Sequence, residues 1–279
     1  MNEAAAMNLA HSALTDSRAA PRASNAAPAS TPVHPRALLD LPPGEARQSL
    51  IAVHEILSAE LNSAELAVYE AGGGATSFLP LDIMRRAHVT VVDIDETQNL
   101  NNDYADEKIL GDIQTYRFQP DSFDLVICYN VIEHLPDVQA ALLRFCECLK
   151  KDGLILIGAP NPNSLSGIVT KYTPHWFHVW FYRHIRGEKK AGLPGEAPFP
   201  THFHPLVTLS NLEAFAVSRG LQVIYRKRYE SPRYPEMRRR KPLLAALIDM
   251  AARTMNALLP GRIDVRHGDY HVILRKLAA

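Results

Sequence analysis

The sequence predicts an α/β protein built on a doubly wound, mostly parallel sheet. Continuous apolar runs with the length of buried strands lie at 65–70, 88–95, 123–130 and 154–160. Helix-like stretches separate these runs, and right-handed crossovers then place helices on both faces of the sheet. A triple glycine follows the first run, where the sheet of such a fold opens into its ligand crevice.

The composition of the 279-residue chain bounds its class. A hydrophobic content of 47% with 22% charged residues is ordinary for a soluble globular protein of one large domain or two small ones. The formal net charge is zero, so no global field steers the molecule toward nucleic acid or an anionic surface. Three cysteines cannot form a closed disulfide framework, which indicates a reducing compartment. Because the sequence shows neither a membrane-spanning apolar run nor a signal-peptide pattern, we expect a cytoplasmic protein.

Residues 1–43 differ from the rest of the chain. They are rich in Ala, Pro, Ser and Asn, and they bury too little apolar area to offset the entropy of ordering, so we expect a disordered tail. One domain is expected over residues 44–279. It opens with apolar positions spaced as one helical face within 45–61.

The elements of this domain are expected in a strand–helix alternation. A helix should follow the glycines to about Arg86, and a polar helix at 96–107 should precede a short strand at 108–112. A helix over 136–153 should have Pro136 in its first turn. Beyond the strand at 154–160, the expected segments are an insert at 161–205, a helix at 206–220, a strand at 221–230, a basic segment with an amphipathic helix within 226–260, and a last strand at 269–276.

The acidic residues near the glycines indicate the ligand. Asp93 closes the second strand, where a carboxylate can accept from two ribose hydroxyls, so a nucleoside-containing cofactor is expected. A dinucleotide fingerprint is incomplete, because Ser77 stands at its third glycine position, and no Walker A motif is present. Glu70 would repel a pyrophosphate but favours an ammonium or sulfonium charge, and S-adenosylmethionine carries both.

Several motifs, in order, resemble those of the class I S-adenosylmethionine-dependent methyltransferases. "YEAGGGATS" at 69–77 is similar to their E/D-x-G-x-G motif, and "VVDID" at 91–95 to the strand that ends in a ribose-binding acid. "LGDIQTYRFQPDSFDLVICYNVIEHLPD" at 110–137 and "GLILIGAPNPNS" at 153–164 resemble the motifs of the fourth and fifth strands. The resemblance covers about residues 50–165 and is nearest to the small-molecule, ubiquinone-type O-methyltransferases. It implies a seven-stranded, Rossmann-like methyltransferase fold with a helical insert after the fifth strand.

The resemblance also implies roles for the matching residues. The cofactor-binding residues are then Glu70 near the methionine amino group, Gly72, Gly73 and Gly74 along the methionine and ribose, Asp93 at the ribose hydroxyls, Ile94 and Ile113 beside the adenine, Asp112 at the adenine amino group, and Asn130 through its backbone carbonyl. The alternative for Asp112 is a plain turn residue after a strand. Asp95 either joins the site or caps the next helix.

Methyl transfer from a sulfonium needs mainly orientation of the acceptor, with a base only when the acceptor loses a proton. His134, just past the fourth strand, is the candidate catalytic base, and its alternative role is a helix-entry histidine bonded to backbone. Further histidines lie in the insert, at His175, His178, His202 and His204. They lack an accompanying set of carboxylates or cysteines, so no metal site is expected.

Two segments bear on the acceptor and on partners. Aromatic residues concentrated at 176–182 form either the wall of an aromatic or lipid-like acceptor site or the packing of an added helix. The cations that follow, up to residue 186, also suit a membrane interface. The basic segment and amphipathic helix at 226–260 suit anionic lipid or an acidic partner. The commoner arrangement, which we favour here, is a solvated charged face with the helix packed in the protein.

We therefore expect methyl transfer from S-adenosylmethionine to a hydroxyl oxygen of a small or lipid-linked acceptor. Peripheral contact with the inner membrane face would use 176–186 or 226–260. The alternatives are methyl transfer to a macromolecule, a non-catalytic S-adenosylmethionine-binding module, and a dehydrogenase, which the glycine spacing and Glu70 disfavour. No RNA-binding or DNA-binding motif supports a nucleic-acid partner.

Overall fold

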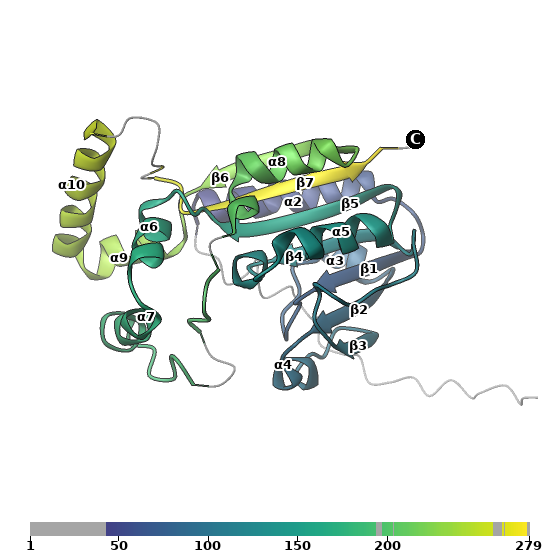
Figure 1. Cartoon of the computed structure of the whole chain (residues 1–279), viewed down its shortest axis with the longest axis horizontal. Coiled ribbons are helices and arrows are strands. Elements are labelled where there is room, and N and C mark those ends of the chain that lie inside the picture. Colours follow the sequence, from purple (N-terminus) through teal and green to yellow (C-terminus); the bar gives the residue numbers. More distant parts are fainter. Residues whose placement is uncertain (1–42, 194–196, 203, 259–263, 265, 278–279) are drawn as a thin grey trace, which may run out of the picture. The chain divides into compact units, whose positions relative to one another are not determined.

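Seven strands form one sheet in the order β3-β2-β1-β4-β5-β7-β6 (Figure 1). The computed structural model describes residues 43–193, 197–202, 204–258, 264 and 266–277. The strands are β1 (Leu66–Ala71), β2 (Ala87–Asp93), β3 (Glu107–Leu110), β4 (Phe123–Tyr129), β5 (Leu149–Pro160), β6 (Leu221–Tyr229) and β7 (Asp269–Lys276). β7 is antiparallel to both neighbours and the remaining pairs are parallel, which confirms the predicted mostly parallel sheet.

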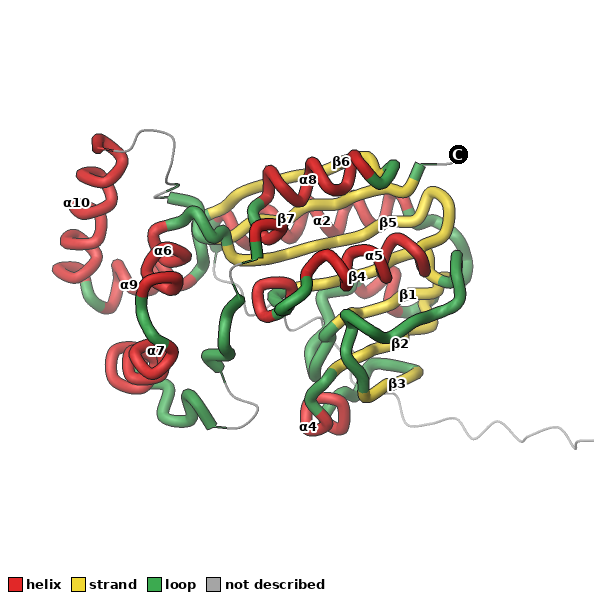
Figure 2. Tube along the Cα trace, viewed as in Figure 1, coloured by secondary structure: helices red, strands yellow, loops and turns green. Residues whose placement is uncertain are grey.

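Helices alternate with the strands through β5, except that β3 and β4 are joined by turns alone, and further helices follow β5 and β6 (Figure 2). They are α2 (Glu45–Glu60), α3 (Leu81–Met84), α4 (Glu96–Leu100), α5 (Val138–Cys148), α6 (Leu165–Tyr172), α7 (His175–Phe181), α8 (Leu209–Ser218), α9 (Arg233–Arg240) and α10 (Pro242–Leu258). Short helical turns occur at Ile132–His134, Tyr182–Arg186 and Pro205–Val207. Among the described helices, none has the length and apolar content needed to cross a bilayer.

Both faces of the sheet are covered, as the doubly wound fold requires. α5 and α8 pack on one face, where Phe145 and Leu212 join a buried cluster with the strand residue Tyr270 (Figure 1). α2 and α3 pack on the other face, where Leu50 and Ile83 are fully buried. Burying apolar side chains on both faces is what stabilises a parallel sheet.

The strand register fixes where the site lies. Ala71 pairs with Val92, and Glu70 with Ile127, so β1, β2 and β4 end close together at one edge of the sheet. The loops that carry the three glycines, Asp93 and Asn130 therefore leave the sheet side by side.

Two predicted helices are much shorter than expected. The helix after the glycines is only α3, because Pro80 keeps the preceding residue out of the helical region, and Ser77 holds the chain by accepting from the Leu79 N–H at 3.1 Å. The polar helix at 96–107 ends at Leu100. Beyond Leu100, a turn at buried Asn102 takes the place of the expected helix. The Oδ1 atom of Asn102 accepts from the N–H groups of Tyr104 and Ala105 in this turn.

The helix predicted over 136–153 also has different ends. α5 begins after Asp137, whose carboxylate caps it by accepting from the Ala140 N–H at 2.9 Å, so Pro136 lies outside the helix. It ends at Cys148 because Leu149 is extended and already pairs with Phe123 as part of β5. The predicted tail at 1–43 lies outside the described residues, apart from Pro43.

Candidate functional site

The turn after β1 is built from glycine for two reasons. Gly72 and Gly74 have φ values of +67° and +53°, in the left-handed region that side chains strain to adopt. A Cβ at Gly72 would also lie 2.7 Å from both methyl groups of Val131. A Cβ at Gly73 would lie 2.9 Å from the Tyr104 hydroxyl. The turn therefore presents bare backbone, because a side chain at Gly72 or Gly73 would collide with Val131 or Tyr104.

Glu70, the last but one residue of β1, is buried beneath this turn. Its carboxylate accepts hydrogen bonds from the hydroxyls of Ser77 and Tyr104, the second at 2.6 Å. The side chain is only 2% exposed, and burial raises its pKa to about 7 although both hydroxyls oppose that shift. A nearby cation would return this carboxyl to its charged form.

Asp93 joins the glycine turn to the loop after β2. One of its carboxylate oxygens accepts from the Gly74 N–H at 2.9 Å, and the other accepts from the Asp95 N–H at 2.8 Å. Each oxygen can accept a further hydrogen bond from a ligand hydroxyl. Asp95 itself caps α4 by accepting from the N–H groups of Thr97 and Gln98, as one of its two predicted roles required.

The two isoleucines expected beside an adenine ring differ in exposure. Ile94 is 75% exposed, so its side chain is open to a ligand. Ile113 is 4% exposed and belongs to the core cluster between the sheet and α5, so its side chain faces the core. Asp112 forms a turn in which its carboxylate accepts from both nitrogens of Gln114, which is the geometry of its alternative role.

Asn130 follows β4 and adopts a left-handed conformation, with φ of +56°. Its N–H donates to the Gly158 carbonyl at 2.7 Å, which holds this turn against β5. The residue is exposed, and Asn is among the residues that tolerate this conformation best. Its position places the peptide after β4 opposite the glycine turn.

His134 lies in the short helical turn beyond Asn130. Its Nδ1 is 2.7 Å from the Pro200 carbonyl, which can only accept, so Nδ1 carries the proton and Nε2 is left unprotonated in the neutral ring. Nε2 is 3.6 Å from the carboxylate of Glu133. Burial lowers the pKa of His134, and nearby His202 lowers it further, so the ring is neutral at physiological pH. The backbone contact expected of its alternative role is also present.

A family model described as a methyltransferase domain matches residues 69–157, which include the glycine turn, Asp93 and His134. The ubiquinone biosynthesis O-methyltransferase of Neisseria meningitidis serogroup A is 34% identical over 71 residues. Residues 69–157 therefore carry a methyltransferase domain, as the resemblance to the class I S-adenosylmethionine-dependent methyltransferases implied.

Other comparisons set the extent of the likeness. The Neisseria match covers 22% of this chain and 29% of the relative, so it spans less than a third of that protein. YcgJ protein from Bacillus subtilis superposes with a TM-score of 0.51 at 15% identity, over 83% of this chain and 99% of that one. Phosphoethanolamine N-methyltransferase 2 from Haemonchus contortus gives a TM-score of 0.51 at 17% identity, over 83% of this chain and 53% of that one. At these identities the two structures show a shared fold.

A small cavity lies beside the glycine turn. The residues that line it are Glu70, Ala71, Gly72, Gly73, Thr76, Phe78, Ile127 and Tyr129. The rings of Phe78 and Tyr129 stack with their centres 3.6 Å apart and form one wall. Gly158 makes room for this wall, because a Cβ there would lie 2.6 Å from the Tyr129 ring.

A buried histidine that the sequence did not single out supports this wall. His271 of β7 is fully buried, and its Nε2 is 2.6 Å from the Tyr129 hydroxyl and 2.9 Å from that of Tyr229. Its Nδ1 is 2.8 Å from the Ser49 hydroxyl. Burial lowers the pKa of His271 to about 3, so the ring stays neutral. No local sequence pattern predicts this contact, since Tyr129 and His271 are far apart in the chain.

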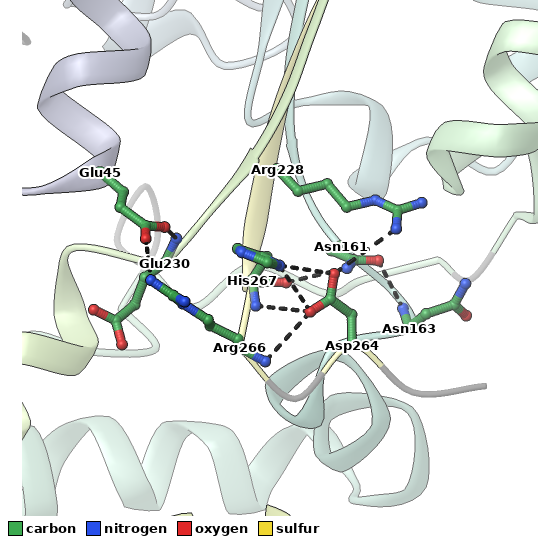
Figure 3. Close-up of polar contacts among 8 residues, drawn as sticks. All are labelled: Glu45, Asn161, Asn163, Arg228, Glu230, Asp264, Arg266 and His267. Carbon is green, nitrogen blue, oxygen red and sulfur yellow. Dashed lines mark hydrogen bonds and ion pairs between the residues drawn. The ribbon is translucent and has the colours of Figure 1, made fainter. Parts of the chain in front are cut away.

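The "PNPNS" motif after β5 anchors the loop that leads into β7 (Figure 3). The buried Asn161 side chain donates to the His267 carbonyl at 3.0 Å, and its Oδ1 accepts from the Asn163 N–H. The Asp264 carboxylate accepts from the His267 N–H, and its ion pair with Arg228 spans 3.8 Å. Figure 3 also shows Arg266 reaching Glu45 at the start of α2. This motif is therefore structural in the described residues.

The aromatic segment lies outside the core. α7 contains no buried residue, and Trp176 and Trp180 are 68% and 45% exposed, so the alternative of an added helix packed onto the sheet is not observed. Among the insert histidines, the rings of His175 and His178 stack with their centres 6.5 Å apart, His178 bonds Thr173, and His204 accepts from the Leu206 N–H. Within the ranges that the structure describes, no three His, Cys, Asp or Glu side chains are grouped as metal ligands.

Proposed function

We propose that this methyltransferase transfers the methyl group of S-adenosylmethionine to a hydroxyl oxygen of a small or lipid-linked acceptor. The observation that carries the proposal is the juxtaposition of Asp93 with the bare glycine turn, 2.9 Å apart, over the buried Glu70. The name of the Neisseria relatives, ubiquinone biosynthesis O-methyltransferase, supports an oxygen acceptor.

The residues present fit the cofactor. Gly72 and Gly73 present bare backbone to the small cavity that they line together with Glu70, so a ligand there would contact backbone and lie beside a carboxylate. Asp93 would hold the ribose hydroxyls and Glu70 the methionine ammonium. The remaining assignments are Gly74 along the ribose, Ile94 and the Asp112–Ile113 turn at the adenine, and the Asn130 carbonyl at the ammonium.

Bound S-adenosylmethionine supplies a methyl carbon activated by a positively charged sulfur. The protein must then hold the acceptor oxygen in line with that carbon and remove its proton. Nε2 of His134 is the free nitrogen of a neutral imidazole, so it can take the proton. The Glu133 carboxylate, 3.6 Å from Nε2, would stabilise the imidazolium that results.

The test is to measure turnover with a panel of phenols and quinols, with the release of S-adenosylhomocysteine as the readout. For an accepted substrate, we expect His134→Ala to lower kcat by about a hundredfold or more with a smaller change in KM. His88→Ala is the matched control, because the exposed side chain of His88 lies at the start of β2, at the opposite end of that strand from Asp93. Equal turnover in the wild type and His134→Ala would remove this base from the mechanism. Methylation confined to protein or RNA fractions would instead favour a macromolecular acceptor.

A further inference from the structure

α10 has apolar side chains on two opposite faces. On one face Ala245 and Ala252 are buried against the protein. On the other face the large apolar residues are exposed along the whole helix, namely Leu243 (83%), Leu247 (58%), Met250 (61%) and Leu258 (74%). Their spacings of four, three and eight residues place them on one stripe of an α-helix. We call these four residues the α10 stripe.

The α10 stripe carries no charge. The charged residues of α10 are Asp249 and Arg253. Asp249 faces α9, because it accepts from the Tyr234 hydroxyl at 2.7 Å and pairs with Arg238. A helix that leaves several large apolar side chains in water along one face normally has a partner surface. The expectation that this helix is simply packed into the protein therefore holds for only one of its faces.

A strongly basic segment leads directly into this helix. Residues 233–241 contain five basic residues and a single acidic one. Arg238 and Arg240 make ion pairs with Glu230 and Glu236 but remain exposed. Arg239 is exposed as well, and the segment keeps a net positive charge next to the α10 stripe.

We propose that α9 and α10 form a docking surface for an anionic lipid surface. The α10 stripe would lie at the boundary between headgroups and acyl chains, with Arg238, Arg239 and Arg240 at the lipid phosphates. Charge complementarity favours lipid over a second copy of this chain. A symmetric contact through the stripe would bring two equally basic α9 segments together, and their repulsion opposes it.

This inference goes beyond methyl transfer and does not depend on it. α9 and α10 belong to an insertion between β6 and β7, whereas the cofactor residues follow β1, β2 and β4. Membrane docking can therefore be measured without a substrate, and its failure would leave the proposed function untouched.

The test is flotation of the full chain with phosphatidylcholine vesicles, with and without phosphatidylglycerol. We expect binding only to the vesicles that contain phosphatidylglycerol. The double variant Leu247→Glu with Met250→Glu should weaken that binding by about tenfold or more, because two inserted apolar side chains are replaced by anions. Val217→Glu is the matched control, since Val217 is 66% exposed on the separate helix α8. Thermal unfolding should be the same in all three proteins.

The charge contribution has its own measurement. Arg239→Gln and Arg240→Gln should each lower vesicle affinity by about fivefold, and added salt should weaken the wild type. No binding to phosphatidylglycerol vesicles, or binding that survives the Leu247→Glu, Met250→Glu change, would overturn the proposal. Sedimentation tests whether a second copy of the chain occupies this surface instead. A dimer that the double variant abolishes, in a protein that does not bind vesicles, would identify a second copy and contradict the lipid assignment.

Discussion

The ends of β1, β2 and β4 and the insertion at 230–268 both combine charged with apolar residues, but they use them in opposite ways. At the strand ends the polar groups are buried and bonded to one another, as Glu70 is to Tyr104 and His271 to Tyr129. In the insertion, large apolar side chains such as Leu243 are exposed beside arginines. The first arrangement makes a rigid site, whose parts are costly to change. Changes to the exposed residues of the insertion should cost little folding stability, and these residues are suited to contact a partner outside the chain.

The largest stability effect is expected at His271. His271→Leu would leave the hydroxyls of Ser49, Tyr129 and Tyr229 without their shared buried partner, and we expect the free energy of unfolding to fall by about 4 kcal/mol. Urea unfolding measures it. His88→Leu is the control, because the exposed side chain of His88 should change stability by less than about 0.5 kcal/mol. Equal stability in both variants would show that the buried network contributes little.

Glu70 should make stability fall as pH rises. Its pKa is raised by burial from 4.5 to about 7, so the folded protein binds a proton that the unfolded chain has released. The contribution to stability is complete below pH 4.5 and is lost as pH rises through about 7, which amounts to about 3 kcal/mol without cofactor.

The measurement is urea unfolding across that pH range in the cofactor-free protein. Glu70→Gln should remove the pH-dependent loss, and Glu65→Gln, at an exposed position next to β1, should keep it. A wild-type profile that matches Glu70→Gln would contradict the buried carboxyl. Cofactor affinity should rise with pH over the same interval, because the charged carboxylate attracts the ammonium.

Two glycine substitutions should have smaller effects on stability, and together they separate the cost of backbone strain from the cost of a steric clash. Gly72→Ala combines a left-handed φ with a contact of 2.7 Å to Val131, and should cost about 2 kcal/mol and abolish cofactor binding. Gly220→Ala has a similar φ of +73° but nothing within 4 Å of the added Cβ, so it should cost about 1 kcal/mol and leave binding intact. Equal stability costs, with cofactor binding kept in Gly72→Ala, would mean that the turn is not a contact surface.

The same comparison explains what could be predicted from the sequence. The strands and the cofactor motif are local patterns, so β7 was predicted with its observed ends, and Glu70 and Asp93 were identified from their distances to the glycines. Tyr104 could not be found this way, because Asn102 breaks the helix that was expected there. The contact of His271 with Tyr129 depends on the sheet topology rather than on neighbours in the chain.

The insertion shows a second reason why part of the structure could not be predicted from the sequence. The helical periodicity of α10 is clear in the sequence, and the observed Pro242–Leu258 lies within the predicted range 226–260. Periodicity does not say which apolar face is covered, since Ala245 and Leu247 both satisfy an apolar pattern. Only the packing distinguishes the buried alanines from the exposed leucines.

The most direct test of the central claim is calorimetric titration of the chain with S-adenosylmethionine, S-adenosylhomocysteine and NAD. The wild type should bind both adenosyl ligands and not NAD. Asp93→Ala should weaken their binding by about thirtyfold or more, because charge-assisted hydrogen bonds to the ribose are lost, while the exposed control Asp103→Ala should bind normally. Binding of NAD instead, or an Asp93→Ala variant with wild-type affinity for S-adenosylmethionine, would contradict the site described at Gly72, Gly73, Gly74 and Asp93.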